Sequence, residues 1–266
     1  MDPNETTDSS EQTTEETGEL SHSDKMIGVF TEPSRMFSIT SRFAAKHKDW
    51  VIPILTFFIV VSLIRILAMT NEEVYFEAKK QGIDRIEKMV ESGTLTREQA
   101  DQQIDTMDTY MRGPMSWIFT FIPTLLFGFI FIIAIAGIYF LLIKLVLKGE
   151  GTFTGALVSI GLSSYISILQ IVIAGILTMV MGKLMMDTSV ASFIGSDKNT
   201  IAGWFLSKID PISIWAYIVL SIGFAKMNKS ESTGKYYVLV FAVWLIGTFI
   251  WFQITQAVPF LQGFSQ

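Results

Sequence analysis

The chain has 266 residues, half of them hydrophobic and 17% charged, and its mean hydropathy of +0.44 excludes an ordinary water-soluble domain. The formal net charge of -5 says little about partners, because eight of the 25 acidic residues lie in the first 24 positions. The absence of cysteine excludes disulfides and thiolate sites, and the two histidines, His22 and His47, both precede the first long apolar stretch. An imidazole-rich metal site within a membrane is therefore excluded as well.

The first 24 residues are acidic and polar, and we expect a disordered tail because they offer almost no apolar surface to bury. Residues 25–49 differ, since apolar residues at helical spacing alternate with basic ones, and Pro33 suits the first turn of a helix. This pattern predicts a basic amphipathic helix at the membrane surface, with a plain basic connector as the alternative. The candidate lipid or partner contacts in this segment are Arg35, Arg42, Lys46 and Lys48.

Residues 50–69 form the first apolar stretch, which matches the roughly 20 residues that a helix needs to cross a bilayer. Asp49 is positioned to cap this helix, and Trp50 suits the headgroup level. Arg65 lies near the far end of the stretch, where its side chain can snorkel to the membrane surface. A functional partner inside the membrane is the alternative, which makes Arg65 a candidate intramembrane polar residue.

Residues 71–112 are rich in charge and predict a hairpin of two amphipathic helices outside the membrane. The segment Ser92-Gly93-Thr94 breaks the periodic pattern, and Thr96 followed by Gln99 has the spacing of a capping box for the second helix. No pattern in the hairpin is typical of a catalytic or metal site, so we interpret its charged face as solvated.

Two further apolar stretches follow, at residues 117–147 and 153–181. The first exceeds one simple span, which tilting would accommodate. The second carries a small residue at every fourth position, and such a seam lets two helices in lipid approach closely. We interpret the seam as a helix contact within the protein, with a homodimer contact and a hydroxyl-lined polar path as alternatives. Its residues are Gly151, Gly155, Ser159, Ser163 and Ser167.

Gln170 is the single amide side chain of the 153–181 stretch and is placed to hydrogen-bond to another helix. The fourth stretch, residues 209–227, is short but begins with Asp210 and Pro211, a good N-cap followed by a good first helical residue. The fifth stretch, residues 236–258, contains Gln253 as another candidate intramembrane polar residue and precedes a short tail, residues 259–266.

Together these stretches predict an all-α polytopic membrane bundle of five transmembrane helices within residues 50–258, with the extramembrane helical hairpin between spans 1 and 2. Five spans place the two chain ends on opposite sides of the membrane. Basic residues directly before the first span and in the two very short loops favour a cytoplasmic N-terminus and an external C-terminus.

Three features together resemble the bacterial branch of the Ypt-interacting-protein (YIP domain) family of five-span membrane proteins. They are Glu32-Pro33 followed by Phe37, the string from Asp210 to Trp215, and the five-span layout with a Lys-containing loop before the last span. The resemblance covers about residues 27–258. It implies a helical bundle with a cytoplasmic N-terminus and no known enzymatic activity, and we expect the chain in the bacterial cytoplasmic (inner) membrane.

Eukaryotic members of that family bind small Rab-type GTPases and act in vesicle budding. This chain departs from their pattern, because it lacks their Tyr-Gly-Pro-type segment, for which Arg112-Gly113-Pro114 is the nearest string. The Rab-binding role is therefore not carried over to this chain.

The sequence predicts a non-enzymatic membrane scaffold or organiser that acts through protein or lipid contacts, because no catalytic constellation accompanies the apolar helices. A small transporter or channel is the alternative, although five spans do not divide into two equal repeats. We expect membrane lipids as partners, with a protein partner or a homo-oligomer as further alternatives. No cofactor, metal or nucleic acid is expected.

Overall fold

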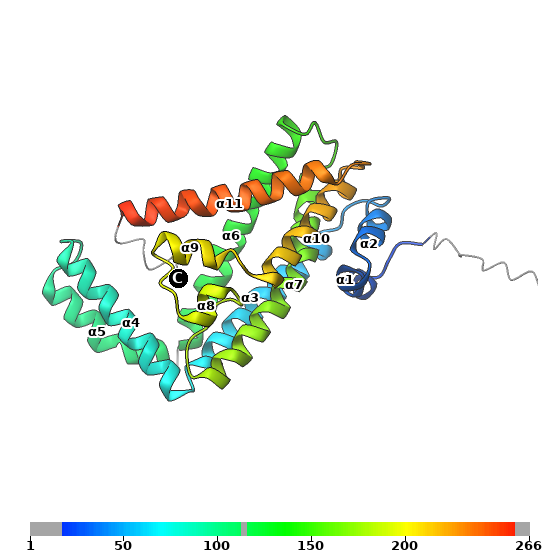
Figure 1. The fold of residues 1–266 in the computed structure, drawn as a ribbon. Coiled ribbons are helices and arrows are strands. Elements are labelled where there is room, and N and C mark those ends of the chain that lie inside the picture. The colour runs from blue at the N-terminus through cyan, green and yellow to red at the C-terminus, as the bar shows by residue number, and fades with distance from the viewer. Residues whose placement is uncertain (1–17, 113–115, 259–266) are drawn as a thin grey trace, which may run out of the picture.

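The computed structural model describes residues 18–112 and 116–258, and over these ranges the regular structure is entirely helical. Figure 1 shows long crossing helices, with two short N-terminal helices packed on one side and a pair of helices projecting at the opposite end. In chain order the helices are α1 His22–Thr31, α2 Pro33–Thr40, α3 Lys48–Ala68, α4 Glu72–Glu91, α5 Arg97–Arg112, α6 Ser116–Leu145, α7 Phe153–Met181, α8 Val190–Ile194, α9 Ile201–Ser207, α10 Pro211–Met227 and α11 Gly234–Ala257.

The centre of the fold is α7, which packs against α3, α10, α6 and α1. Helix α3 runs parallel to α7. Trp50 lies against Gly161, and 14 residues further along both helices Ile64 lies against Gly175. In lipid, where burial brings little hydrophobic gain, such close backbone approach supplies van der Waals contacts between helices. The two glycines are therefore the points that set the distance between α3 and α7.

Replacing Gly161 with alanine is expected to destabilise the bundle by about 1–3 kcal/mol, the usual cost of overpacking. A Cβ atom at this position would lie 2.4 Å from the Trp50 Cα atom, so a backbone must move. Reversible unfolding of the full chain in mixed micelles, followed by tryptophan fluorescence, measures the change. Gly137 on α6 is the matched control, since a Cβ atom there meets no atom within 4 Å. Equal unfolding free energies for the two alanine variants would contradict the close approach.

Four helices are long and apolar enough to cross a membrane, namely α3, α6 from Phe121 onward, α7 and α11. Helix α10 has 17 residues and rises only about 25 Å, which is less than a hydrocarbon core of about 30 Å. Helices α9 and α10 are long and apolar enough only as a pair, which bends by 61° at a short break, as a broken span or a re-entrant loop does. The described part of the chain thus provides four spans, or five when this bent pair counts as one.

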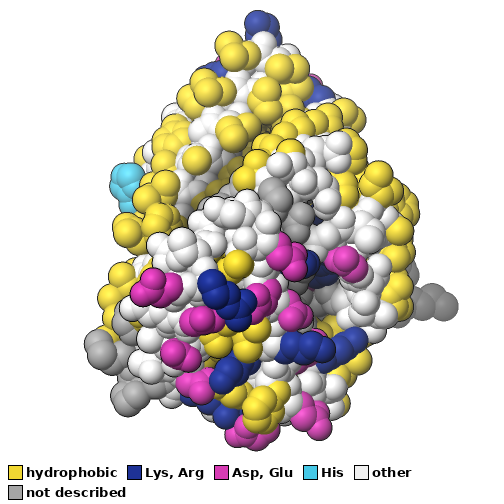
Figure 2. Space-filling model, turned by 90° about the vertical axis from the view of Figure 1, so that its left-hand side faces the viewer, with side chains coloured by type: hydrophobic (Ala, Val, Ile, Leu, Met, Phe, Trp, Pro, Cys, Tyr) yellow, Lys and Arg dark blue, Asp and Glu magenta, His cyan; other side chains and the backbone are white. Residues whose placement is uncertain are grey.

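Helices α4 and α5 lie side by side at one end of the molecule (Figure 1), and three ion pairs join them. Lys79 Nζ is 2.7 Å from Asp108 Oδ1, Arg97 Nη1 is 2.6 Å from Glu87 Oε2, and Arg112 Nη1 is 2.9 Å from Glu72 Oε1. The predicted capping box at the start of α5 is confirmed, since Thr96 and Gln99 exchange side-chain and backbone hydrogen bonds. Figure 2 shows charged side chains over the lower half of this face, where α4 and α5 lie, below a mainly hydrophobic upper half.

Two predictions for the N-terminal region are wrong. The predicted disordered tail reaches residue 24, but α1 begins at His22 because Ser21 and Asp24 form a capping box. The rest of that tail, residues 1–17, lies outside the described residues, as does the predicted C-terminal tail, residues 259–266. The single helix predicted over residues 25–49 is instead α1 and α2, separated at Glu32, because a residue before proline disfavours the helical conformation. Pro33 does occupy the first turn of α2, as predicted.

Candidate functional site

Helices α1 and α2 dock onto the bundle through one apolar face, which the surface-helix prediction assigned to the membrane. Val29 and Phe37 are fully buried in a cluster formed with α7 and α10. The ring of Phe37 fits over Gly223 of α10, where a Cβ atom would lie 2.9 Å from the ring. The segment is therefore part of the folded protein, and its position on the bundle is fixed by packing.

A buried ion pair lies beneath α1. Lys25 Nζ is 2.6 Å from Asp49 Oδ2, and the two side chains are only 2% and 1% exposed. His22 Nδ1 lies 3.1 Å from the other carboxylate oxygen, while its Nε2 lies 2.8 Å from the hydroxyl of Tyr165 on α7. These four residues, which we call the N-terminal clip, tie α1 to the start of α3 and to α7.

The clip overturns the prediction that Asp49 caps the first span. Helix α3 begins at Lys48 without a side-chain cap, and the Asp49 carboxylate points to Lys25 instead. Sequence reasoning placed Lys25 among the surface bases and gave His22 no role. No local spacing connects these residues to Asp49, because the ion pair joins positions 24 residues apart.

The four predicted basic contact residues all lie outside the clip and are exposed. Arg35 is 3.1 Å from Glu32, and Lys46 is 2.5 Å from Glu19, so part of this charge is balanced within the segment. Arg42 and Lys48 form no ion pair with any residue that the structure describes. These two bases carry the uncompensated positive charge of the segment.

The predicted small-residue seam of α7 lies largely against α10. Gly155 and Ser159 are buried, and Ser159 lies beside Gly223, so the two helices approach closely there. Ser163 is also buried, and its hydroxyl has no hydrogen-bond partner among the described residues. At the ends of the seam, Gly151 donates its N–H to Asn228 Oδ1 at 2.8 Å, whereas Ser167 is half-buried.

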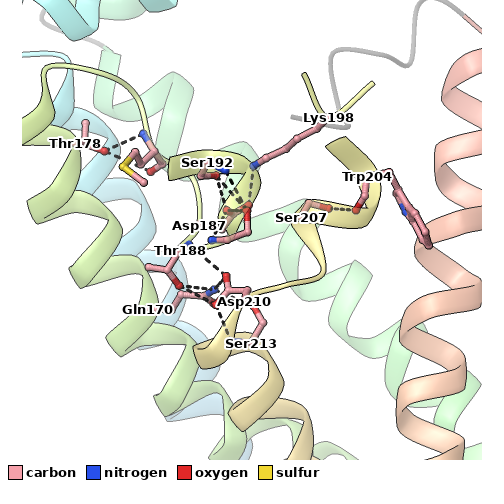
Figure 3. Close-up of polar contacts among 12 residues, drawn as sticks. Gln170, Thr178, Asp187, Thr188, Ser192, Lys198, Trp204, Ser207, Asp210 and Ser213 are labelled. Carbon is pink, nitrogen blue, oxygen red and sulfur yellow. Dashed lines mark hydrogen bonds and ion pairs between the residues drawn. The ribbon is translucent and has the colours of Figure 1, made fainter. Parts of the chain in front are cut away.

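A buried polar network surrounds Asp210 (Figure 3). Its carboxylate accepts five hydrogen bonds: Oδ1 from the Thr188 hydroxyl and from the N–H groups of Ile212 and Ser213, Oδ2 from Gln170 Nε2 and from the Thr188 N–H. The predicted N-cap at Asp210 is thus confirmed. Gln170 also donates to Ser213 Oγ at 2.8 Å, which confirms its predicted bond to another helix.

A second carboxylate, Asp187, lies next to this network in the segment between α7 and α8 (Figure 3). It accepts hydrogen bonds from the hydroxyls of Ser189 and Ser192, and Lys198 Nζ is 2.7 Å away. Burial raises the pKa of Asp187, but the Lys198 charge and these hydrogen bonds outweigh it and lower the pKa to about 2. Asp187 and Lys198 are 11 residues apart in the chain, and no local pattern in the sequence predicted their pairing.

The three predicted intramembrane polar residues do not meet. Gln170 belongs to the Asp210 network, whereas Gln253 is exposed on α11. Arg65 lies in the last turn of α3 and lines a cavity of about 570 Å³ between α3, α4, α5 and residues 183–198. The buried carboxylates hold helices together, and the oxygens of Asp210 are already occupied, so they are poorly placed to act as general bases.

In the residues that the structure describes, no three His, Asp or Glu side chains converge as metal ligands. A protein-family model described as the Yip1 domain matches residues 27–254, a range that includes Asp49 and Asp210 but begins after His22 and Lys25. No curated protein and no solved structure matches the chain.

Proposed function

The chain belongs to the Yip1-domain family of membrane proteins, and from that premise we propose that it is a non-enzymatic membrane scaffold that acts through contacts with anionic lipid. The contact surface is the α1–α2 segment together with residues 41–48. We place the chain in the bacterial cytoplasmic membrane as a five-span protein, with the N-terminus cytoplasmic, the C-terminus outside and the α4–α5 pair outside the bilayer.

The observation that carries this proposal is the second face of α1, which points away from the bundle. Met26 and Ile27 are 37% and 57% exposed on it, although their side chains are apolar. The uncompensated bases Arg42 and Lys48 follow in the same segment. Segments that lie in the headgroup region of an anionic membrane typically combine an apolar helix face with nearby Lys and Arg residues.

The distribution of charge between the two ends of the bundle supports the orientation. Residues 18–50, 144–152 and 226–235 meet at one end and contain ten Lys and Arg against six Asp and Glu. The opposite end is formed by residues 65–112 and 182–210. It contains ten Lys and Arg against thirteen Asp and Glu. The two ends thus hold equal numbers of bases, and the orientation rests on their local placement. Basic residues close to span ends favour the cytoplasmic side, and Arg42, Lys46 and Lys48 directly precede the first span.

Electron paramagnetic resonance of spin-labelled lipids tests the proposal on the full chain in liposomes. The association of spin-labelled phosphatidylglycerol relative to phosphatidylcholine measures the selectivity for anionic lipid. We expect the double variant Arg42→Gln, Lys48→Gln to lower this selectivity at least about fivefold, because each base near an anionic surface contributes about 1 kcal/mol.

Lys80→Gln, Lys88→Gln is the matched control, since it removes the same charge from exposed positions on α4. Equal selectivity in the wild type and in the Arg42, Lys48 variant would refute the proposal. Solute flux through reconstituted protein above that of empty liposomes would favour the transporter or channel instead.

A further inference from the structure

The cavity of about 570 Å³ lies at the end of the bundle opposite to α1 and α2. Arg65 from α3 and Arg85 from α4 line one part of it, and Lys183 and Lys198 line the part formed by the segment after α7. Its acidic lining residues are Glu77 and Asp197. Its volume lies within the range of small-molecule sites, which is about 300–1,000 Å³.

The cavity lining carries four bases against two acids, so its positive charge exceeds its negative charge. Glu77 and Asp197 keep their charges, because the groups that donate to them are neutral: the Leu184 N–H and Gln81 for Glu77, and the Asn199 N–H and amide for Asp197. Lys198 pairs with Asp187 outside the lining, so the remaining cations are Arg65, Arg85 and Lys183.

Lys183 donates to the backbone oxygens of Ser192 and Phe193, which are neutral, so its charge is not cancelled.

The two arginines are the strongest sign of a ligand. Neither the Arg65 nor the Arg85 guanidinium group forms a hydrogen bond or an ion pair with a residue that the structure describes, and both side chains are exposed. Arg65 and Arg85 line the same cavity from two different helices, α3 and α4. Residues 113–115, which follow α5, contain no Asp or Glu that could balance them. Two guanidinium groups that line one cavity, with no acidic partner among the described residues, form a suitable site for an anion.

We infer that this cavity binds an anionic phosphate group, with Arg65 and Arg85 as its ligands and Lys183 adding charge. Guanidinium groups match the oxygens of phosphate in bidentate geometry. Arg65 lies in the last turn of a span, which is the level of lipid headgroups. The phosphate belongs either to a lipid headgroup or to a free anion. This inference goes beyond the proposed scaffold role and uses residues at the other end of the molecule.

Calorimetric titration of the full chain in neutral detergent, at constant ionic strength, tests the site. The probes are inorganic phosphate, dihexanoyl phosphatidylglycerol and dihexanoyl phosphatidylcholine. Saturable binding of inorganic phosphate identifies a free-phosphate site, and saturable binding of phosphatidylglycerol alone identifies a headgroup site. In either case we expect the variant Arg65→Gln, Arg85→Gln to weaken binding at least about tenfold, because two charge-assisted contacts are lost.

The control is again Lys80→Gln, Lys88→Gln, which makes the same charge change on exposed side chains outside the cavity. Arg85→Gln alone serves if the double variant fails to fold, because Arg85 lies exposed on α4. The inference is overturned if neither anion binds saturably, if phosphatidylcholine binds as well as phosphatidylglycerol, or if loss of the arginines leaves the affinity unchanged. Each of these results leaves the lipid selectivity of Arg42 and Lys48 unaffected, so the two proposals fail separately.

Discussion

The variant Asp210→Asn is expected to lose about 3 kcal/mol or more of unfolding free energy, although asparagine has nearly the size of aspartate. Asp210 is 1% exposed, and each of its oxygens accepts at least two hydrogen bonds. An asparagine amide presents one oxygen and one NH₂ group in place of the two carboxylate oxygens. If the NH₂ group takes the place of Oδ1, three donors face it, and if it takes the place of Oδ2, two donors face it. Each buried group left unpaired costs about 1–3 kcal/mol.

Reversible unfolding of the full chain in mixed micelles measures this loss. Gln170→Leu removes one of the five donors and should cost less, about 1–2 kcal/mol, because four bonds to Asp210 survive. Asp105→Asn on α5 is the isosteric control at an exposed position and should change stability by less than about 0.5 kcal/mol. If Asp210→Asn were as mild as Asp105→Asn, the five-bond network would be wrong.

The second large effect is expected at the N-terminal clip. Lys25→Met keeps most of the side-chain volume but leaves the Asp49 carboxylate 1% exposed with only His22 beside it. Removing one partner of a buried ion pair typically costs 3–5 kcal/mol, because the other charge is left buried and uncompensated. The same variant should also lower the selectivity for phosphatidylglycerol, since α1 loses its attachment to α3.

A double-mutant cycle separates the ion pair from simple packing. Replacing Lys25 with methionine and Asp49 with asparagine together removes both charges, so the double variant should be more stable than Lys25→Met alone. Lys80→Met provides the control at an exposed lysine. If the effects of the two clip substitutions simply added, Lys25 and Asp49 would not interact in the folded protein.

Helix boundaries were predictable where the signal is local. Asp210 before Pro211, Pro33 after Glu32, and Thr96 with Gln99 each fix a helix start through groups within three residues of one another, and the structure has all three. The capping box of Ser21 and Asp24 is equally local. It was overlooked because it lies at the edge of an acidic tail that offers no apolar surface.

The partners of charged side chains were not predictable, because they depend on which helices meet. Lys25 lies among other bases and apolar residues, a context in which a lysine is normally solvated, and only the fold brings Asp49 beneath it. The same reasoning applies to Arg65. Its place near the end of a span was consistent with snorkelling, whereas its position beside Arg85 follows from the way α4 folds back over the cavity.

The small-residue seam is one of two faces through which α7 packs against other helices. Its spacing indicated a close helix contact, and Gly155 and Ser159 do lie against α10. The tightest approach, however, is on another face of α7, at Gly161 and Gly175, which contact α3. Glycines 14 residues apart form no obvious repeat in an apolar stretch, so the sequence alone did not distinguish this second face.

The parallel pairing of α3 with α7 has a consequence for biogenesis. Trp50 and Gly161 are about 110 residues apart, and the whole of α4, α5 and α6 is synthesised between them. The first span must therefore wait in the bilayer without its main neighbour until α7 has been inserted, and loop closure over such a distance is slow. Until then the face of α3 that packs on Gly161 and Gly175 is open to lipid or to assembly factors. Misassembly of the nascent chain is therefore most expected in this interval.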